Sequence, residues 1–264
     1  MVVGTKSSEG GDRADLSLPA WQDAVAAAVV AANPKTVVIA RCPGACFMPW
    51  AQAANAILYE LMPGQESGNS IAATLFGWNN PSGRLPVSFP ASMNDTWITS
   101  PAQYPGTDRG RGFPESDYTE ELLMGYRHYD AKGITPLWTF GEGLSYSKFS
   151  YSNIAVSGSV TASTSATIFA QVCWTAGPPG KEVAQLYIGY PAAANEPPKL
   201  LKGFQKVDLV DDPSSCAGVA FPLSADDLMI WDSTGMQWTL VPGLYTAWVG
   251  STHNDIRLTT TFTV

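Results

Sequence analysis

The stretch Val2-Val3-Gly4-Thr5-Lys6-Ser7-Ser8-Glu9-Gly10-Gly11-Asp12-Arg13 decides how the first part of the chain folds. Two β-branched residues lead into a loop rich in Gly and Ser, and helix signals follow from Ser17. This order predicts a strand, a loop and a helix. Ligands of open parallel sheets bind at the loops that leave the carboxyl ends of strands, so Glu9 is a candidate site residue, although most glutamates in such loops are only solvated charges.

The following segments repeat the alternation of helix and strand. A helix is expected from Ser17 to Asn33-Pro34, with these apolar residues facing a sheet: Trp21, Val25, Ala28, Val29 and Ala32. Continuous apolar runs predict buried strands over 36–40 and 56–61, and a helix over 65–76 should turn Ile71 and Leu75 inward. Right-handed crossovers would bring Glu9, Arg41 to Cys46 and Gln65-Glu66 to one rim of the sheet.

Three parallel strands make a thin sheet, and the first begins at the start of the chain with nothing before it to cover the neighbouring edge. We therefore expect an α/β domain over residues 1–90 that continues on polypeptide upstream. Pro81 to Pro90 is expected to be a turn and a short edge strand, because proline at both ends excludes a central strand. Residues 91–150 are expected to form a long loop that wraps between domains.

Short alternating segments separated by Gly and Pro turns predict a β-sandwich over residues 151–264. The expected strands cover 154–156, 167–174, 182–188, 200–204, 218–223, 243–249 and 256–264. If Cys173 ends the second strand and Cys216 begins the fifth, antiparallel pairing brings them within bridging reach, and the sequence leaves open whether they are bonded. Cys42 and Cys46 are predicted either to pack within their loop or to form a local disulfide bridge.

Composition limits the partners. A net charge of −8 without long charged runs argues against nucleic acid, and no apolar run reaches the roughly 20 residues of a membrane span. Neither the four cysteines nor any other spacing indicates a metal site, and no cofactor motif is present. The nine Trp and ten Tyr exceed the needs of a core and would suit stacking on sugar rings.

An ordered set of motifs resembles glycoside hydrolase family 3 of the β-glucosidase type. The opening loop from Ser8 to Pro19 is similar to the family's SGEGYDR-DLSLP segment, and Pro63 to Asn69 is similar to its PGQEGGN turn. Further matches are NPSGRLPVSFP at 80–90, GYRHYD at 125–130, FGEGLSY at 140–146 and EVAQLY with LKGF in a fibronectin type III-like tail.

The resemblance implies a three-part enzyme: a barrel with an aspartate nucleophile, an α/β sandwich with an acid/base glutamate, and the β-sandwich. Glu9 matches the acid/base, whereas the nucleophile and the barrel have no counterpart in this chain. Retaining hydrolysis needs two carboxyl groups about 5 Å apart, so Glu9 is expected to be exposed here and the chain to be inactive alone. By resemblance, the enzyme acts on β-glucosides, is extracellular and uses no cofactor.

Several residues depart from the family pattern or attract a different interpretation. Glu142 replaces a common His and Gly11 a common Tyr. The charged cluster formed by Arg127, His128 and Asp130 is read as a structural wedge between domains, and His253 as a solvated residue of the last hairpin.

Two hypotheses from different classes remain, beside the simpler one of a truncated product without function. The first is the C-terminal portion of a β-glucosidase-like enzyme that supplies the acid/base Glu9. The second is a non-catalytic carbohydrate-binding or assembly module, in which the aromatic residues of the β-sandwich bind.

Overall fold

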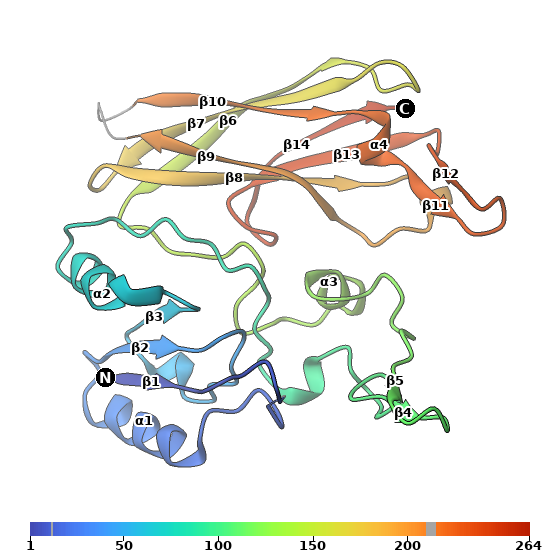
Figure 1. The fold of residues 1–264 in the computed structure, drawn as a ribbon. Coiled ribbons are helices and arrows are strands. Elements are labelled where there is room, and N and C mark those ends of the chain that lie inside the picture. The colour runs from blue at the N-terminus through green and yellow to red at the C-terminus, as the bar shows by residue number, and fades with distance from the viewer. Residues whose placement is uncertain (12, 210–214) are drawn as a thin grey trace.

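A computed structural model describes residues 1–11, 13–209 and 215–264. Figure 1 shows a small α/β layer at one end, a β-sandwich at the other and a long segment that connects them. The helices are α1 (Ala20–Ala32), α2 (Ser67–Leu75), α3 (Tyr126–Lys132) and α4 (Ala225–Leu228). The strands are β1 (Val2–Gly4), β2 (Val37–Arg41), β3 (Ala56–Glu60), β4 (Thr107–Asp108), β5 (Pro114–Glu115), β6 (Lys148–Gly158), β7 (Ala166–Ala176), β8 (Gly180–Gly189), β9 (Leu200–Leu209), β10 (Cys216–Leu223), β11 (Ile230–Asp232), β12 (Gln237–Thr239), β13 (Leu244–Gly250) and β14 (Ile256–Thr263).

The α/β layer is built on a parallel sheet in the order β1-β2-β3. Its strands are apolar because helices cover both faces, with α1 below the sheet and α2 above it in Figure 1. The core beneath the sheet includes Val3, Val38 and Ala40 together with residues of α1. The sequence-based prediction of a mostly parallel sheet followed by an all-β part is therefore confirmed.

The buried face of α1 differs from the predicted one. Ala26 and Val30 are buried, whereas Trp21 and Val25 are exposed. Polar contacts explain the rotation, because the Gln22 side chain accepts a hydrogen bond from the Gly4 N–H (2.7 Å). The helix begins at Ala20, with Pro19 as its N-cap and no side-chain cap. Small and polar residues thus turn inward, and the large apolar residues that the periodicity favoured lie on the opposite face.

Two further predictions in this layer need correction. Leu75 at the end of α2 is exposed. The buried residue of this short helix is instead Ser67, at its start. The expected edge strand before Pro90 is reduced to a single bridge between Phe89 and Trp138. Leu85 also pairs with Glu142 and Gly141 through its backbone, so the segment is held by the connecting chain rather than by the sheet.

The helix α3 lies within the connecting segment and packs against the sandwich (Figure 1). The Tyr126 hydroxyl accepts a hydrogen bond from the Leu201 N–H (2.9 Å), and Asp130 lies 3.5 Å from the Lys199 ammonium. The prediction that His253 is solvated is wrong, since its side chain is only 2% exposed. The turn after β13 folds back onto α3, so the His253 ring packs against Tyr126 and its Nε2 lies 3.4 Å from Asp130.

The sandwich contains the seven predicted strands, in two sheets with the orders β10-β7-β6 and β14-β13-β8-β9. Alternate residues of both sheets form one core, which includes Ile168, Leu186 and Tyr245. Cys173 and Cys216 lie opposite each other in the β7 and β10 register and form a disulfide. Among the described residues, no helix is long and apolar enough to cross a membrane.

Candidate active site

Glu9 lies at the tip of a tight turn in the loop that follows β1. Ser8 and Gly11 bridge each other across this turn, which leaves Glu9 and Gly10 at its end. The Glu9 side chain is exposed, as the sequence predicts, and it makes no hydrogen bond or ion pair with another described residue. A side chain at position 11 would have room, because a Cβ built on Gly11 meets no atom within 4 Å. The glycine found in place of the family's tyrosine therefore leaves open space beside Glu9.

The chain is held by hydrogen bonds on either side of this turn. The Thr5 N–H donates to the Arg41 carbonyl (3.2 Å), which fixes the loop where it leaves β1. Beyond the turn, the Arg13 Nη2 donates to the Ser17 carbonyl (2.9 Å) and the Phe47 N–H donates to the Leu16 carbonyl (2.8 Å). The fold therefore presents an exposed carboxyl group on a backbone that is held at both ends.

A second group of polar side chains gathers at the carboxyl ends of β2 and β3. Arg41 Nε lies 3.2 Å from Glu60 Oε2, and Arg41 Nη2 donates to Ser67 Oγ (2.7 Å). Ser67 in turn donates to the same Glu60 oxygen (3.0 Å). Glu60 is buried and its oxygens are occupied, so this group stabilises the sheet edge and offers no free proton donor.

Two of the residues predicted at the rim have partners of their own. Arg41 ends β2 and contacts Glu60 and Ser67, and the exposed Glu66 accepts a hydrogen bond from the Asn69 side chain (2.6 Å). The sequence analysis missed Glu60 and Ser67. The signal for Glu60 was available, because the last residues of two adjacent parallel strands lie opposite each other and Arg41 pairs with Glu60 in register.

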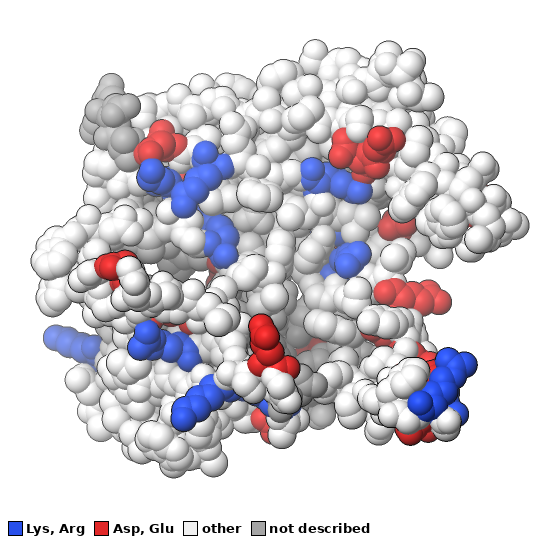
Figure 2. Space-filling model, in the orientation of Figure 1, with Lys and Arg blue, Asp and Glu red and all other residues white. Residues whose placement is uncertain are grey.

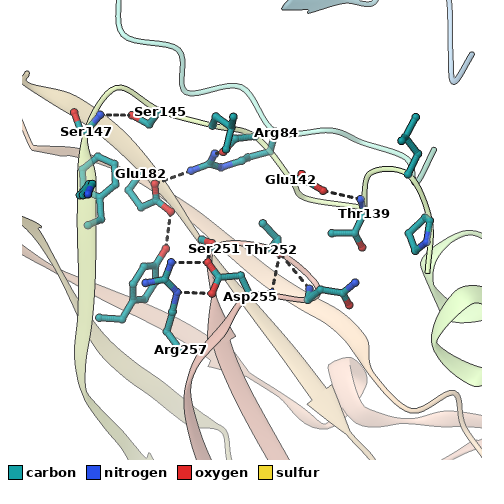
Figure 3. A pocket seen from close by; sticks show the side chains of 18 of the residues that line it. Arg84, Thr139, Glu142, Ser145, Ser147, Glu182, Ser251, Thr252, Asp255 and Arg257 are labelled. Atoms are coloured by element: carbon teal, nitrogen blue, oxygen red, sulfur yellow. Dashed lines mark hydrogen bonds and ion pairs between the residues drawn. The ribbon is translucent and has the colours of Figure 1, made fainter. Parts of the chain in front are cut away.

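A pocket of about 670 Å³ lies between the connecting segment and the sandwich, as Figure 3 shows. Its most buried charged side chains are paired: Arg84 Nη2 lies 2.6 Å from Glu182 Oε2, and the Tyr151 hydroxyl donates to the other Glu182 oxygen (2.7 Å). Burial raises the pKa of the Glu182 carboxyl, and the Arg84 charge opposes that effect. Asp255 is likewise paired with Arg257. These contacts therefore join the connecting segment to the sandwich. Unlike Glu9, each carboxylate that lines the pocket has a hydrogen-bond or ion-pair partner.

Glu142, which departs from the family pattern, has a structural partner. Glu142, at the position of the family's histidine, accepts a hydrogen bond from the Thr139 N–H (2.8 Å) and so closes a turn. Within residues 1–11, 13–209 and 215–264, no group of three His, Cys, Asp or Glu side chains could hold a metal ion. Figure 2 shows acidic and basic side chains interspersed over one face, without a large patch of either sign.

Comparison with known proteins identifies both parts of the chain. Residues 1–146 match the family model of the glycosyl hydrolase family 3 C-terminal domain, and residues 182–253 match that of a fibronectin type III-like domain. The probable beta-glucosidase L of Aspergillus terreus is 36% identical over 98% of this chain and 36% of its own length. Beta-glucosidase BoGH3A of Bacteroides ovatus is 33% identical over 96% of this chain and 34% of its own length.

Solved structures agree with these relatives. DesR, a beta-glucosidase from Streptomyces venezuelae solved in complex with D-glucose, superimposes with a TM-score of 0.91 at 33% identity, over 100% of this chain and 33% of its own. The beta-D-glucoside glucohydrolase of Trichoderma reesei gives a TM-score of 0.87 at 31% identity, over 100% of this chain and 39% of its own. The chain thus spans about a third of the length of these proteins. It belongs to glycosyl hydrolase family 3, of which it holds the C-terminal domain and a fibronectin type III-like domain.

Proposed function

We propose that this chain is the C-terminal portion of a retaining β-glucosidase and that Glu9 is its acid/base. The observation that carries the proposal is the free carboxyl group at the tip of the β1 loop, in a chain similar to beta-glucosidases over nearly its whole length. The substrate class is a terminal β-D-glucosyl residue of a glucoside or gluco-oligosaccharide. A barrel segment upstream supplies the nucleophilic aspartate and the loops that bind the sugar.

The proposed chemistry needs two carboxyl groups on opposite sides of the anomeric carbon. In the first step, the aspartate attacks that carbon while Glu9 gives its proton to the leaving oxygen. In the second step, Glu9 takes a proton from water, which then displaces the aspartate with net retention. In the isolated chain, the turn that carries Glu9 is exposed. In the assembled enzyme, the barrel and the bound sugar surround the carboxyl group and exclude water from it.

The proposed enzyme requires no cofactor, because two carboxyl groups and water complete both steps. We further propose an extracellular location. The disulfide between Cys173 and Cys216 supports it, since such bonds persist in oxidising compartments and are rare in the cytosol.

The isolated chain is expected to hydrolyse 4-nitrophenyl β-D-glucoside no faster than its Glu9→Gln variant, because the nucleophile lies elsewhere. Supplying the barrel segment, fused upstream or added in trans, should produce turnover that depends on Glu9. Release of 4-nitrophenol measures both cases. Turnover by the isolated chain that disappears in Glu9→Gln would contradict the proposal, since it would mean that this chain also contains the second carboxyl group.

We infer a second candidate function, glucan binding, from the hairpin formed by β11 and β12. Trp231 and Trp238 lie opposite each other on this hairpin with ring centroids 5.6 Å apart, and their side chains are 48% and 64% exposed. Met236 in the connecting turn is exposed as well. Large exposed aromatic side chains of this kind are typical of binding surfaces and suit the apolar faces of sugar rings.

If the hairpin binds glucan, the double change Trp231→Ala and Trp238→Ala should weaken binding of the chain to a soluble β-glucan about 30-fold, the size expected for removal of a central contact. Trp21→Ala on α1 is the matched control, because Trp21 is exposed but lies in the α/β layer. Glu9→Gln should bind like the unaltered chain. Isothermal titration without measurable heat for the unaltered chain would exclude this function.

A further inference from the structure

Two cysteines directly after β2 have no part in the proposed chemistry. Cys42 and Cys46 are free thiols, and both side chains are buried in the core of the α/β layer. The loop that carries them is closed by the Tyr59 hydroxyl of β3, which donates to the Gly44 carbonyl. Buried thiols usually serve only as small apolar side chains. In this core, however, the Arg13 guanidinium and the Tyr59 hydroxyl also face Cys46.

The Arg13 guanidinium connects this loop to the one that carries Glu9. Arg13 Nη1 donates to Cys46 Sγ at 3.8 Å, while Nη2 donates to the Ser17 carbonyl at 2.9 Å. One rigid planar group thus holds both loops. A backbone bond supports the same junction, because the Phe47 N–H donates to the Leu16 carbonyl. Arg13 follows Glu9 by four positions, so the junction fixes the chain immediately after the turn.

The groups that face Cys46 are Cys42, Tyr59 and Arg13. The hydrogen bond with Cys42 lowers the pKa of Cys46 to about 6, assisted by Tyr59 and Arg13 and opposed by burial. The same hydrogen bond and burial raise the pKa of Cys42. These opposite shifts favour the thiolate at Cys46 over Cys42, and the Arg13 guanidinium that donates to Cys46 Sγ is its positive neighbour.

We propose that Cys46, in contact with Arg13, is a positioning residue that fixes the loop of Glu9 and so determines where the Glu9 carboxyl group lies. The inference rests on the proposed function of Glu9 for its catalytic consequence, but not for its structural one. A thiol that only filled space would tolerate any small side chain. A thiolate that holds Arg13 requires an acceptor at this position.

The structural consequence is measured on the chain itself. Cys46→Ala is expected to raise hydrogen exchange of the amides in residues 5–17 at least about tenfold, because it removes a hydrogen bond between charged groups. Cys46→Ser, which keeps a neutral acceptor, should give a smaller increase. Val30→Ala is the matched control, since it deletes methyl groups from the same core without touching Arg13. Exchange in Cys46→Ala that equals the Val30→Ala value would overturn the proposal.

A spectroscopic measurement separates the charge from simple packing. The thiolate absorbance at 240 nm should titrate near pH 6 in the unaltered chain and disappear from that range in Cys46→Ser. Arg13→Gln should move the midpoint upward by about one pH unit, because the positive neighbour is lost. An unchanged midpoint in Arg13→Gln would show that the guanidinium does not hold the thiolate, and would overturn the proposal.

The catalytic consequence is measured in the enzyme assembled with its barrel segment. There, Cys46→Ala should lower kcat for 4-nitrophenyl β-D-glucoside about tenfold and leave KM within twofold, as expected of a misplaced acid/base. An unchanged kcat in an enzyme that Glu9→Gln inactivates would overturn the proposal. Full activity of Glu9→Gln would instead contradict the proposed function, while hydrogen exchange and thiolate titration would still decide whether Cys46 holds the loop.

Discussion

In an enzyme that joins this chain to its barrel segment, Glu9→Gln is expected to lower kcat on unactivated β-glucosides by about 10²- to 10⁴-fold. The amide occupies the same space on the exposed turn but cannot give a proton to the leaving oxygen. In kcat/KM, which reports only the first step, the loss should be much smaller for 2,4-dinitrophenyl β-D-glucoside, because that leaving group departs without a proton. Initial rates on both substrates measure the difference.

Azide provides an independent check on the role of Glu9. It attacks the glycosyl-enzyme without a general base, so it should accelerate Glu9→Gln and yield β-glucosyl azide with retained configuration. Asp226→Asn is the matched control. Asp226 is exposed in α4, and no described residue hydrogen-bonds to its side chain, so this variant should keep full activity. Equal losses of kcat/KM on unactivated and 2,4-dinitrophenyl glucosides, without azide rescue, would contradict the acid/base role.

The second large effect concerns stability, at the joint between the connecting segment and the sandwich. Glu182→Ala is expected to lower the free energy of unfolding by about 3–5 kcal/mol, because it leaves the Arg84 guanidinium buried without its carboxylate. The two side chains are only 10% and 3% exposed. Tyr151 also loses the acceptor of its hydroxyl. Urea unfolding followed by tryptophan fluorescence measures the change.

The same strand offers a matched control for this measurement. Lys181 precedes Glu182 on β8 and pairs with Asp208 at 2.6 Å, but those side chains are 50% and 49% exposed. Solvent screening limits such a pair to about 1 kcal/mol or less, so Asp208→Ala should change stability little. Replacing both buried partners, as Arg84→Met with Glu182→Leu, should recover much of the loss. Equal effects of Glu182→Ala and Asp208→Ala would show that burial does not strengthen the contact.

The sequence predicted the sandwich well because its strands carry a pattern of period two. Most of these strands bury one face, so alternation in a stretch such as Leu244 to Val249 shows both the strand and its inward residues. The same logic put Cys173 and Cys216 within bridging reach and left open whether they are bonded; in the structure Cys216 begins β10 and lies opposite Cys173 inside β7. In such regions, local pattern and tertiary environment agree.

Prediction failed where side chains far apart in sequence decide the packing. The periodicity of α1 pointed to Trp21 and Val25, but the sheet accepts the smaller Ala26 and the hydrogen bond of Gln22 instead. His253 was assigned to solvent because nothing near it in sequence indicates that α3 covers its turn. Contacts of this kind depend on the assembled fold and leave no local signal.

The candidate site shows the same division. The position of Glu9 in a loop after the first strand follows from the residue order alone, and the structure places it at the tip of an exposed turn. The junction of Arg13 with Cys46 spans 33 positions. Neither an arginine nor a cysteine indicates such a contact in the sequence, so the contact is seen only in the folded structure.

The pairing of β8 with β13 also has a consequence for synthesis on the ribosome. The three strands β1, β2 and β3 of this chain can pair with one another once Glu60 has been made. In contrast, Gln185 of β8 pairs with Gly250 of β13. About 65 further residues must therefore be synthesised before β8 can pair with β13. At translation rates of about 5–20 residues per second, an apolar strand stays incomplete for roughly 3–13 s, the interval in which a nascent chain is most prone to aggregate.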